Sequence, residues 1–157
     1  MSNDVRNQLI GEVAHEVAEL QNAVDIVDEA AAKRLGINRT DLRVLGALVR
    51  RGSMTAGQLA KVSGLTPGAM TTAIDRLERA GYVRRARAAD DRRSVLVEVT
   101  AEGNTRSDEL YGPIGQEGIA SLAHYTDQEL LLVRDFLRAA RELQERHAQR
   151  ISVEGTP

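Results

Sequence analysis

The sequence has 157 residues, with 21 lysines and arginines, 23 aspartates and glutamates, and a formal net charge of −2. This length accommodates one compact domain, or a small domain with long accessory helices. The absence of cysteine excludes a disulfide framework, a cysteine-ligated zinc site and a thiol nucleophile. No apolar run has the length needed to cross a bilayer and the N-terminus lacks the form of a signal peptide, so we expect a cytoplasmic protein.

Charge is distributed unevenly along the chain. Residues 33–93 hold 14 basic and 5 acidic side chains, whereas the remainder holds 7 basic and 18 acidic ones. A basic middle between acidic ends is typical of a chain in which one part approaches phosphate, although charge also varies along chains without that function. The absence of Trp, with one Phe and three Tyr, argues against stacking platforms for single-stranded nucleic acid.

The first 35 residues predict a long amphipathic helix from about residue 5 to residue 35, and Gly36 is expected to end it. Its apolar side chains recur at spacings of 4, 4, 3, 4 and 3, which is typical of a helical stripe close to a heptad seam. Asn38 follows as the cap of a second helix over residues 39–51. The members of the stripe are Leu9, Val13, Val17, Leu20, Val24 and Val27.

Two short helices joined by a tight turn follow in the basic segment. Thr55 and Gln58 have the spacing of a capping box and open the first helix. Thr66, followed by Pro67, opens the second helix after a turn at residues 63–65 with a central glycine. This pair predicts a helix-turn-helix. The inward face of its second helix consists of Met70, Ala73, Ile74 and Leu77.

A β-hairpin is predicted directly after the second short helix, because the apolar period changes there from 3.6 to 2. Residues 82–87 and 94–99 form its strands, and residues 88–93 form its polar tip. Valines at alternate positions of the second strand support the assignment. The hairpin therefore has the form of a wing beside the helix-turn-helix.

Two helical segments complete the chain. Thr100 caps the first, and Gly112–Pro113 is expected to break or kink it, since the residue before a proline avoids helical angles. A capping box at Thr126 and Glu129 opens the last helix, which is expected to reach about Arg150. The apolar stripe of that helix is Leu130, Val133, Leu137 and Ala140.

These elements predict a mainly α fold with a small β-hairpin wing, in which terminal helices frame a winged helix-turn-helix. The expected domains are an N-terminal dimerisation helix (1–36), a DNA-binding domain (37–100), C-terminal dimerisation helices (101–151) and a frayed tail (152–157). The terminal stripes could pack within one chain, but two long amphipathic helices around a small domain favour pairing of two copies. The predicted dimerisation residues are Leu9, Val13, Val17, Leu20, Leu130, Val133 and Leu137.

Double-stranded DNA is the expected partner, because the major groove accepts one α-helix with small polar and basic side chains on its outward face. The competing interpretations are a solvated helix face, charge protection of an edge strand for Arg84 and Arg85, and simple turn formation for Asp91. A carboxylate at Asp91 can also brace a neighbouring guanidinium. The predicted DNA-binding residues are Thr55, Thr66, Pro67, Gly68, Thr71, Thr72, Arg76, Arg84, Arg85, Arg92 and Arg93.

The sequence resembles the MarR-type winged helix-turn-helix regulators over nearly its whole length. The specific match is Asp91-Arg92-Arg93 followed, after five residues, by Val99-Thr100, where the family has Asp-x-Arg, five residues and Leu-Thr. Residues 65–81 are similar to the family's recognition helix, with Thr72 where the family often has a longer basic residue. The resemblance implies a homodimer, Arg93 in the minor groove braced by Asp91, and a small lipophilic or phenolic effector.

Signals for other classes of function are weak. Glu12, His15 and Glu19 share a helical face, but no further His or Cys is available to complete a conventional metal site, so neither a metal nor a cofactor is expected. His15, Tyr111 and Tyr125 are loose candidates for an effector site. We therefore expect a ligand-responsive repressor acting on a palindromic operator. The alternatives are a winged-helix protein-interaction module and, more remotely, a small-molecule-binding enzyme.

Overall fold

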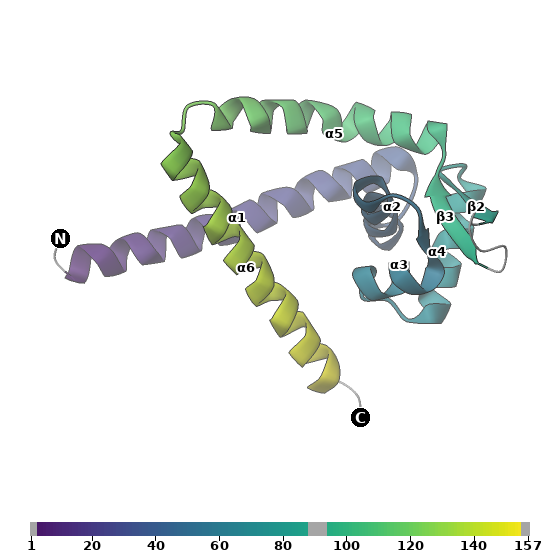
Figure 1. Cartoon of the computed structure of the whole chain (residues 1–157), viewed down its shortest axis with the longest axis horizontal. Helices are drawn as coiled ribbons and strands as arrows, with labels where there is room; N and C mark the ends of the chain where they lie inside the picture. The colour runs from purple at the N-terminus through teal and green to yellow at the C-terminus, as the bar shows by residue number, and fades with distance from the viewer. Residues whose placement is uncertain (1–2, 88–93, 155–157) are drawn as a thin grey trace. The chain divides into compact units, whose positions relative to one another are not determined.

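The computed structural model describes residues 3–87 and 94–154, and the side chains up to residue 151 within these ranges. The chain forms two compact units, residues 1–112 and 113–157. Figure 1 shows a largely helical chain with one small sheet, so the predicted fold class is confirmed. The helices are α1 (Asn3–Leu35), α2 (Arg39–Arg51), α3 (Ala56–Ser63), α4 (Pro67–Arg79), α5 (Ala101–Leu122) and α6 (Asp127–Glu154). The strands are β1 (Met54–Thr55), β2 (Val83–Arg87) and β3 (Val95–Val99).

The helix starts predicted from capping residues are confirmed. The Asn38 side chain accepts a hydrogen bond from the backbone of α2, and Thr66 caps α4 in the same way. Thr55 and Thr126 each form the full capping box, in which a Gln or Glu side chain three residues later bonds back to the cap. Thr100 accepts from the first turn of α5 at 3.0 Å. Local hydrogen bonding thus sets where these helices begin.

The three strands form one antiparallel sheet in the order β1-β3-β2. β2 and β3 make the predicted hairpin, with Val83 opposite Val99 and Arg87 opposite Val95. The short strand β1 was not predicted, because two residues are too few to show an alternating pattern. It pairs Met54 with Val97 and so fastens the start of α3 to the hairpin. The predicted hairpin tip lies outside the described residues.

The hydrophobic core of the first unit lies among α2, α3, α4 and the sheet, and the C-terminal end of α1 closes it. The predicted inward face of α4 is confirmed, since its four apolar residues are buried. Burying one large apolar side chain contributes about 2 kcal/mol, so the rotation of α4 about its own axis is set by packing. Its opposite face therefore points to solvent.

Two boundaries of the C-terminal helices differ from those predicted. Gly112–Pro113 does not break the chain into two helices, because α5 continues through Pro113 to Leu122. A proline inside a helix removes one amide donor and crowds the carbonyl four residues earlier, but the hydrogen bonds of the neighbouring turns can carry the helix past it. The tail was expected to fray from residue 152, but α6 extends to Glu154. Residues 155–157 lie outside the described part of the chain.

The start of α5 is locked to the hairpin around Thr100 and Gly103. The Thr100 hydroxyl donates to the Gly81 carbonyl at 2.6 Å, and the Thr100 amide donates to the Tyr82 carbonyl at 3.0 Å. A Cβ at position 103 would overlap the Tyr82 carbonyl oxygen and lie 2.8 Å from the Val99 Cγ1. Glycine is therefore required where α5 crosses the base of the wing.

The substitution Gly103→Ala tests this close approach. Because the opposing atom is backbone and cannot rotate away, we expect the free energy of unfolding to fall by about 1–3 kcal/mol. Urea unfolding followed by circular dichroism measures the change. The matched control is Gly57→Ala in α3, where a Cβ would meet nothing within 4 Å. Equal stability of the Gly103→Ala variant and the original protein would contradict the proposed crowding.

Candidate nucleic-acid interface

The turn between α3 and α4 brings the start of α4 to the surface. Gly64 has the left-handed conformation, with φ of 64°, which few other residues adopt without strain. Thr66 and Pro67 then start α4 as cap and first helical residue. The exposed residues along the first two turns share small or compact side chains, and they are Thr66, Pro67, Gly68, Ala69, Thr71 and Thr72.

The hydroxyl groups of Thr71 and Thr72 are both engaged with the helix backbone. Thr71 Oγ1 donates to the Pro67 carbonyl, and Thr72 Oγ1 donates to the Gly68 carbonyl, each at 3.0 Å. A hydroxyl has a single hydrogen to donate and two lone pairs to accept with. These two side chains therefore offer a ligand their methyl groups and acceptor oxygens.

Arg76 forms a bidentate ion pair with a buried carboxylate on α2. Its Nε and Nη2 donate to the two Asp41 oxygens at 2.8 and 2.6 Å, and the Asp41 residue is only 1% exposed. The hydrogen bonds to Asp41 raise the pKa of Arg76 above its usual value. Arg76 thus holds α4 against α2, and its predicted contact with DNA stays a prediction.

Arg85 connects the wing strand β2 to α4. Its Nη2 donates to Asp75 at 2.5 Å, its Nη1 bonds Glu78, and its backbone amide donates to Glu78 at 3.1 Å. The hydrogen bond to Asp75 raises the pKa of Arg85. Arg85 therefore fixes the position of β2 on α4, while its predicted contact with DNA stays a prediction.

The other predicted DNA-binding residues differ in their surroundings. Arg84 lies 3.3 Å from Glu98, but its side chain is 67% exposed, and such a surface pair is weak. Thr55 uses its amide and hydroxyl in the capping box with Gln58. Three predicted residues of the wing lie outside the described part of the chain. They are Arg93, the predicted minor-groove contact, Asp91, its predicted brace, and Arg92, a further predicted DNA-binding residue.

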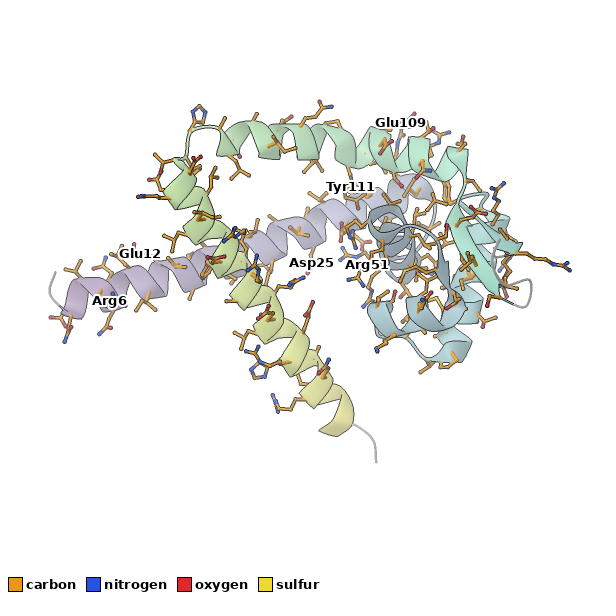
Figure 2. All side chains as sticks on the ribbon, viewed as in Figure 1. Arg6, Glu12, Asp25, Arg51, Glu109 and Tyr111 are labelled. Carbon is orange, nitrogen blue, oxygen red and sulfur yellow. The ribbon has the colours of Figure 1, made fainter. Side chains whose placement is uncertain are left out.

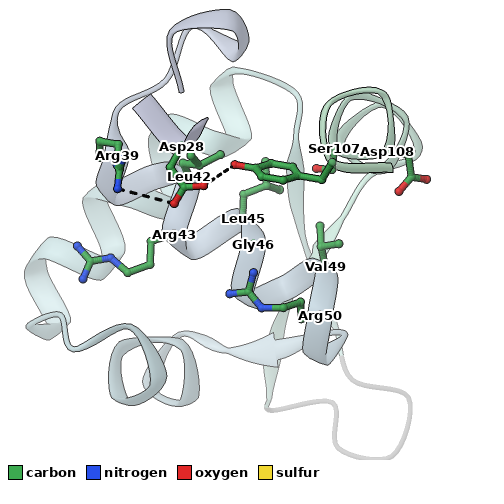
Figure 3. Close-up of a pocket in the computed structure, with 11 residues that line it drawn as sticks. Asp28, Arg39, Leu42, Arg43, Leu45, Gly46, Val49, Arg50, Ser107 and Asp108 are labelled. Atoms are coloured by element: carbon green, nitrogen blue, oxygen red, sulfur yellow. Dashed lines mark hydrogen bonds and ion pairs between the residues drawn. The ribbon is translucent and has the colours of Figure 1, made fainter. Parts of the chain in front are cut away.

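A cavity of about 670 Å³ lies between α1, α2 and the first turns of α5 (Figure 3). At one end, the Tyr111 hydroxyl donates to Asp28 at 2.9 Å, and the other oxygen of Asp28 lies 3.7 Å from the Arg39 guanidinium. Apolar and cationic side chains of α2 complete the wall. The lining residues of α2 are Arg39, Leu42, Arg43, Leu45, Gly46, Val49 and Arg50, and those of α5 are Ser107, Asp108 and Tyr111.

Of the three residues considered for an effector site, Tyr111 lines this cavity. His15 and Tyr125 are exposed and are not among its lining residues. The cations of α2 that line the cavity were not among the predicted site residues. Arg39, Arg43 and Arg50 are separated by 4 and 7 residues, and this helical spacing places them on one face of α2. The spacing alone could therefore have indicated a cationic face on this helix.

The terminal helices expose the apolar stripes that the sequence identified. α1 is buried only near its C-terminal end, whereas Leu9, Val13 and Leu20 are 45%, 48% and 58% exposed. Figure 2 shows the side chains of the outer part of α1, including Arg6 and Glu12, projecting from the helix. In α6, Leu137 is 52% exposed, and no residue of this helix is classed as buried among those described. Among the described residues, each helix therefore has an apolar face that is largely exposed within its own unit.

A short helix pair with an exposed second helix, followed by a β-hairpin, defines the winged helix-turn-helix class of DNA-binding proteins. A sequence model of the MarR family matches residues 35–94. The uncharacterized HTH-type transcriptional regulator YcgE of Bacillus subtilis is 36% identical over 123 residues, which span 78% of this chain and 80% of the relative. The chain belongs to the MarR family and is a DNA-binding transcriptional regulator, not an enzyme.

A second relative supports this assignment, and a solved structure shows the same fold. The HTH-type transcriptional repressor MdtR of Bacillus subtilis is 29% identical over 101 residues, covering 63% of this chain and 64% of the relative. The crystal structure of NadR in complex with 4-hydroxyphenylacetate has the same fold, with a TM-score of 0.61, 22% identity, and coverage of 82% of this chain and 91% of that chain. No helix in residues 3–87 or 94–154 is long and apolar enough to span a membrane.

Replacing Arg76 with alanine tests its structural bond to Asp41. The variant leaves a buried carboxylate without its partner, and we expect the free energy of unfolding to fall by about 3 kcal/mol. Chemical unfolding at pH 7 measures this loss. Arg79→Ala is the matched control, because Arg79 is exposed on the same helix and donates to a backbone carbonyl alone. A loss no larger than that of the control would contradict the structural assignment.

Tyr111 predicts a pH dependence of stability. Burial, followed by the hydrogen bond to Asp28, raises the pKa of Tyr111 from 10.0 to about 12. The folded protein thus favours the neutral phenol, and this stabilisation is complete below pH 10 and is lost as the pH rises through 12. Tyr111→Phe should lower the free energy of unfolding at pH 7 by about 1 kcal/mol and flatten its decline above pH 10.

Urea unfolding at a series of pH values from 7 to 11 measures both effects of the tyrosine variant. Tyr125→Phe is the control, because Tyr125 is 50% exposed and should leave the profile unchanged. A profile of the Tyr111→Phe variant that follows the original protein through the alkaline range would refute the assignment.

Proposed function

We propose that the protein is a ligand-responsive repressor that binds a palindromic operator as a homodimer in the cytoplasm. The observation that carries the proposal is the solvent-exposed face of α4, which is held in a fixed orientation by Arg76 on one side and Arg85 on the other. A helix presented in this way fits the major groove. Repression is supported by the similarity to MdtR, which is named as a repressor.

DNA contact is assigned to two elements. The first turns of α4, with Thr66, Gly68, Thr71 and Thr72, face the base edges. The wing supplies cations, with the exposed Arg84 at the phosphates and Arg93 in the minor groove, where the negative potential is strongest in narrow A·T tracts. Thr55, Pro67 and Arg92 complete the set of proposed contacts, and Asp91 braces Arg93.

Pairing of two copies would cover the exposed stripes of the terminal helices. Leu9, Val13 and Leu20 are half exposed on α1, and Leu137 is half exposed on α6. Burying such residues stabilises an assembly in proportion to the apolar area removed from water. A symmetric dimer places two recognition helices about 34 Å apart, one turn of B-DNA, and so reads two half-sites of a palindrome.

The cavity between α1, α2 and α5 is the proposed effector site. Its volume of about 670 Å³ suits a small molecule. Leu42, Leu45 and Val49 favour an apolar ring, while Arg43 and Arg50 favour an anionic group such as a carboxylate or phenolate. NadR, which has the same fold, was crystallised with 4-hydroxyphenylacetate, a ligand of this chemistry. An effector at this site would release DNA only if it bound more tightly to the conformation that does not bind DNA than to the one that does.

Selection of bound duplexes from a random pool by the purified full-length chain tests the proposal. We expect enrichment of an inverted repeat, a dimer in sedimentation, and an affinity that falls steeply with salt because bound phosphates release counterions. Arg93→Ala should weaken operator binding by about tenfold and leave the dimer intact. Repeating the selection with small phenolic acids present tests the effector.

Arg106→Ala is the matched control for the wing variant, because Arg106 is exposed on α5 and is paired with Glu102 on its own helix. It should leave operator affinity unchanged. A chain that enriches no sequence and shows a flat salt titration would instead support the winged-helix protein-interaction module. A particle that stays monomeric at working concentrations would refute the palindrome.

A further inference from the structure

We propose that α4 recognises A·T base pairs through thymine methyl groups and adenine amino groups, with Thr71 and Thr72 as the specificity-determining residues. The inference rests on the proposed binding of α4 in the major groove. It follows from which chemical groups the recognition helix has available after its internal hydrogen bonds and ion pairs are formed.

The two threonines cannot donate outward while they keep their backbone hydrogen bonds. Each hydroxyl hydrogen is directed to the carbonyl four residues earlier, at Pro67 and Gly68, with an oxygen–oxygen distance of 3.0 Å. The groups left for DNA are one methyl group and the oxygen lone pairs of each residue. A base edge that matches them must offer an apolar group and a hydrogen-bond donor.

The charged side chains of α4 are engaged within the protein or lie far from the start of the helix. α4 is described over its full length, and its basic residues are Arg76 and Arg79. Arg76 is bound to the buried Asp41, and Arg79 lies at the far end of the helix. Asp75 and Glu78 are the carboxylates of α4, and both are bound to Arg85. The side chains that usually select guanine, namely arginine or lysine reaching its O6 and N7 atoms, are thus not available near the start of α4.

The start of α4 also allows close approach. Gly68 has no side chain, and a Cβ built there would meet nothing within 4 Å, so the open space beside it is available to DNA. Ala69 and Pro67 are exposed and apolar. Short side chains let base edges come within van der Waals distance of the threonine methyl groups, which long side chains would prevent.

Base-pair chemistry then favours A·T. In the major groove, an A·T pair presents the thymine methyl group and the adenine amino donor, which match the methyl group and the lone pairs of threonine. A G·C pair also offers a donor, the cytosine amino group, but it presents no methyl group, and the guanine O6 and N7 acceptors cannot pair with an oxygen whose hydrogen is already donated. We therefore expect A·T pairs to be preferred over G·C pairs at the positions that face Thr71 and Thr72.

The test uses the duplex selected by the full-length chain. Each thymine facing α4 is replaced by uracil, which keeps the base pairing and removes only the methyl group. We expect an A·T pair at these positions, and an affinity that falls by about fourfold for each contacted methyl group removed. Fluorescence anisotropy at fixed salt measures the affinity.

Two variants connect the loss to particular side chains. Thr71→Ser and Thr72→Ser keep the hydroxyl group and remove the methyl group, so each should weaken binding to the thymine duplex by about fourfold and be insensitive to uracil at its own position. The matched control is Thr105→Ser, the same change at an exposed position of α5, which should keep the full uracil effect.

The possible outcomes separate this inference from the proposed function. Selection of a half-site with guanine at the positions facing Thr71 and Thr72 would overturn the inference and leave sequence-specific DNA binding intact. Uracil duplexes bound as tightly as thymine duplexes would do the same. Failure to select any sequence would overturn the proposed function and this inference with it. The inference is supported if the uracil effect is lost in the Thr71→Ser and Thr72→Ser variants and is kept in the Thr105→Ser control.

Discussion

The ion pair between Arg76 and Asp41 joins the recognition helix to α2 and defines what that helix can present to DNA. A buried carboxylate is costly without a partner, and a guanidinium that meets both of its oxygens fixes direction as well as distance. Apolar packing of α4 sets its rotation, and this pair adds a directional bond between two helices. The outward face of the first two turns of α4 is then left with small side chains.

Because α2 forms both this bond and most of the cavity wall, the two sites share one helix. Asp41 is bound to α4, while Arg39, Arg43 and Arg50 of the same helix line the cavity. A helix moves largely as a rigid element, so a ligand that shifts α2 also shifts the anchor of α4. The contact of Tyr111 with Asp28 closes the other side of the cavity and links α5 to α1. Binding of the proposed effector would thus be coupled to DNA binding through α2, without any change inside α4.

Local patterns in the sequence predicted most of the helices and strands. They did not predict which side chains far apart in the sequence form pairs. The caps at Asn38, Thr55, Thr66 and Thr126 act within three residues, and the apolar period of α4 reports its own burial. The partner of Arg76 is 35 residues away, and nothing in the sequence around either residue indicates the pair. The same holds for the cavity, which needs side chains from three helices. Pro113 was misjudged because one lost hydrogen bond is less costly than ending a helix that its neighbouring turns support.

The number of basic residues in the segment 33–93 is larger than the number of cations available to contact DNA phosphates. Arg39 is bound to Asp25 on α1, Arg76 to Asp41, and Arg85 to Asp75 and Glu78, so these cations hold the protein together. Non-specific affinity depends on the number of phosphates neutralised, and each internal ion pair lowers that number. A recognition helix with few available cations gains little from phosphate attraction close to the bases. Discrimination between sequences must then come from the shape and chemistry of the base edges. The threonine methyl groups on α4 can make contacts of this kind.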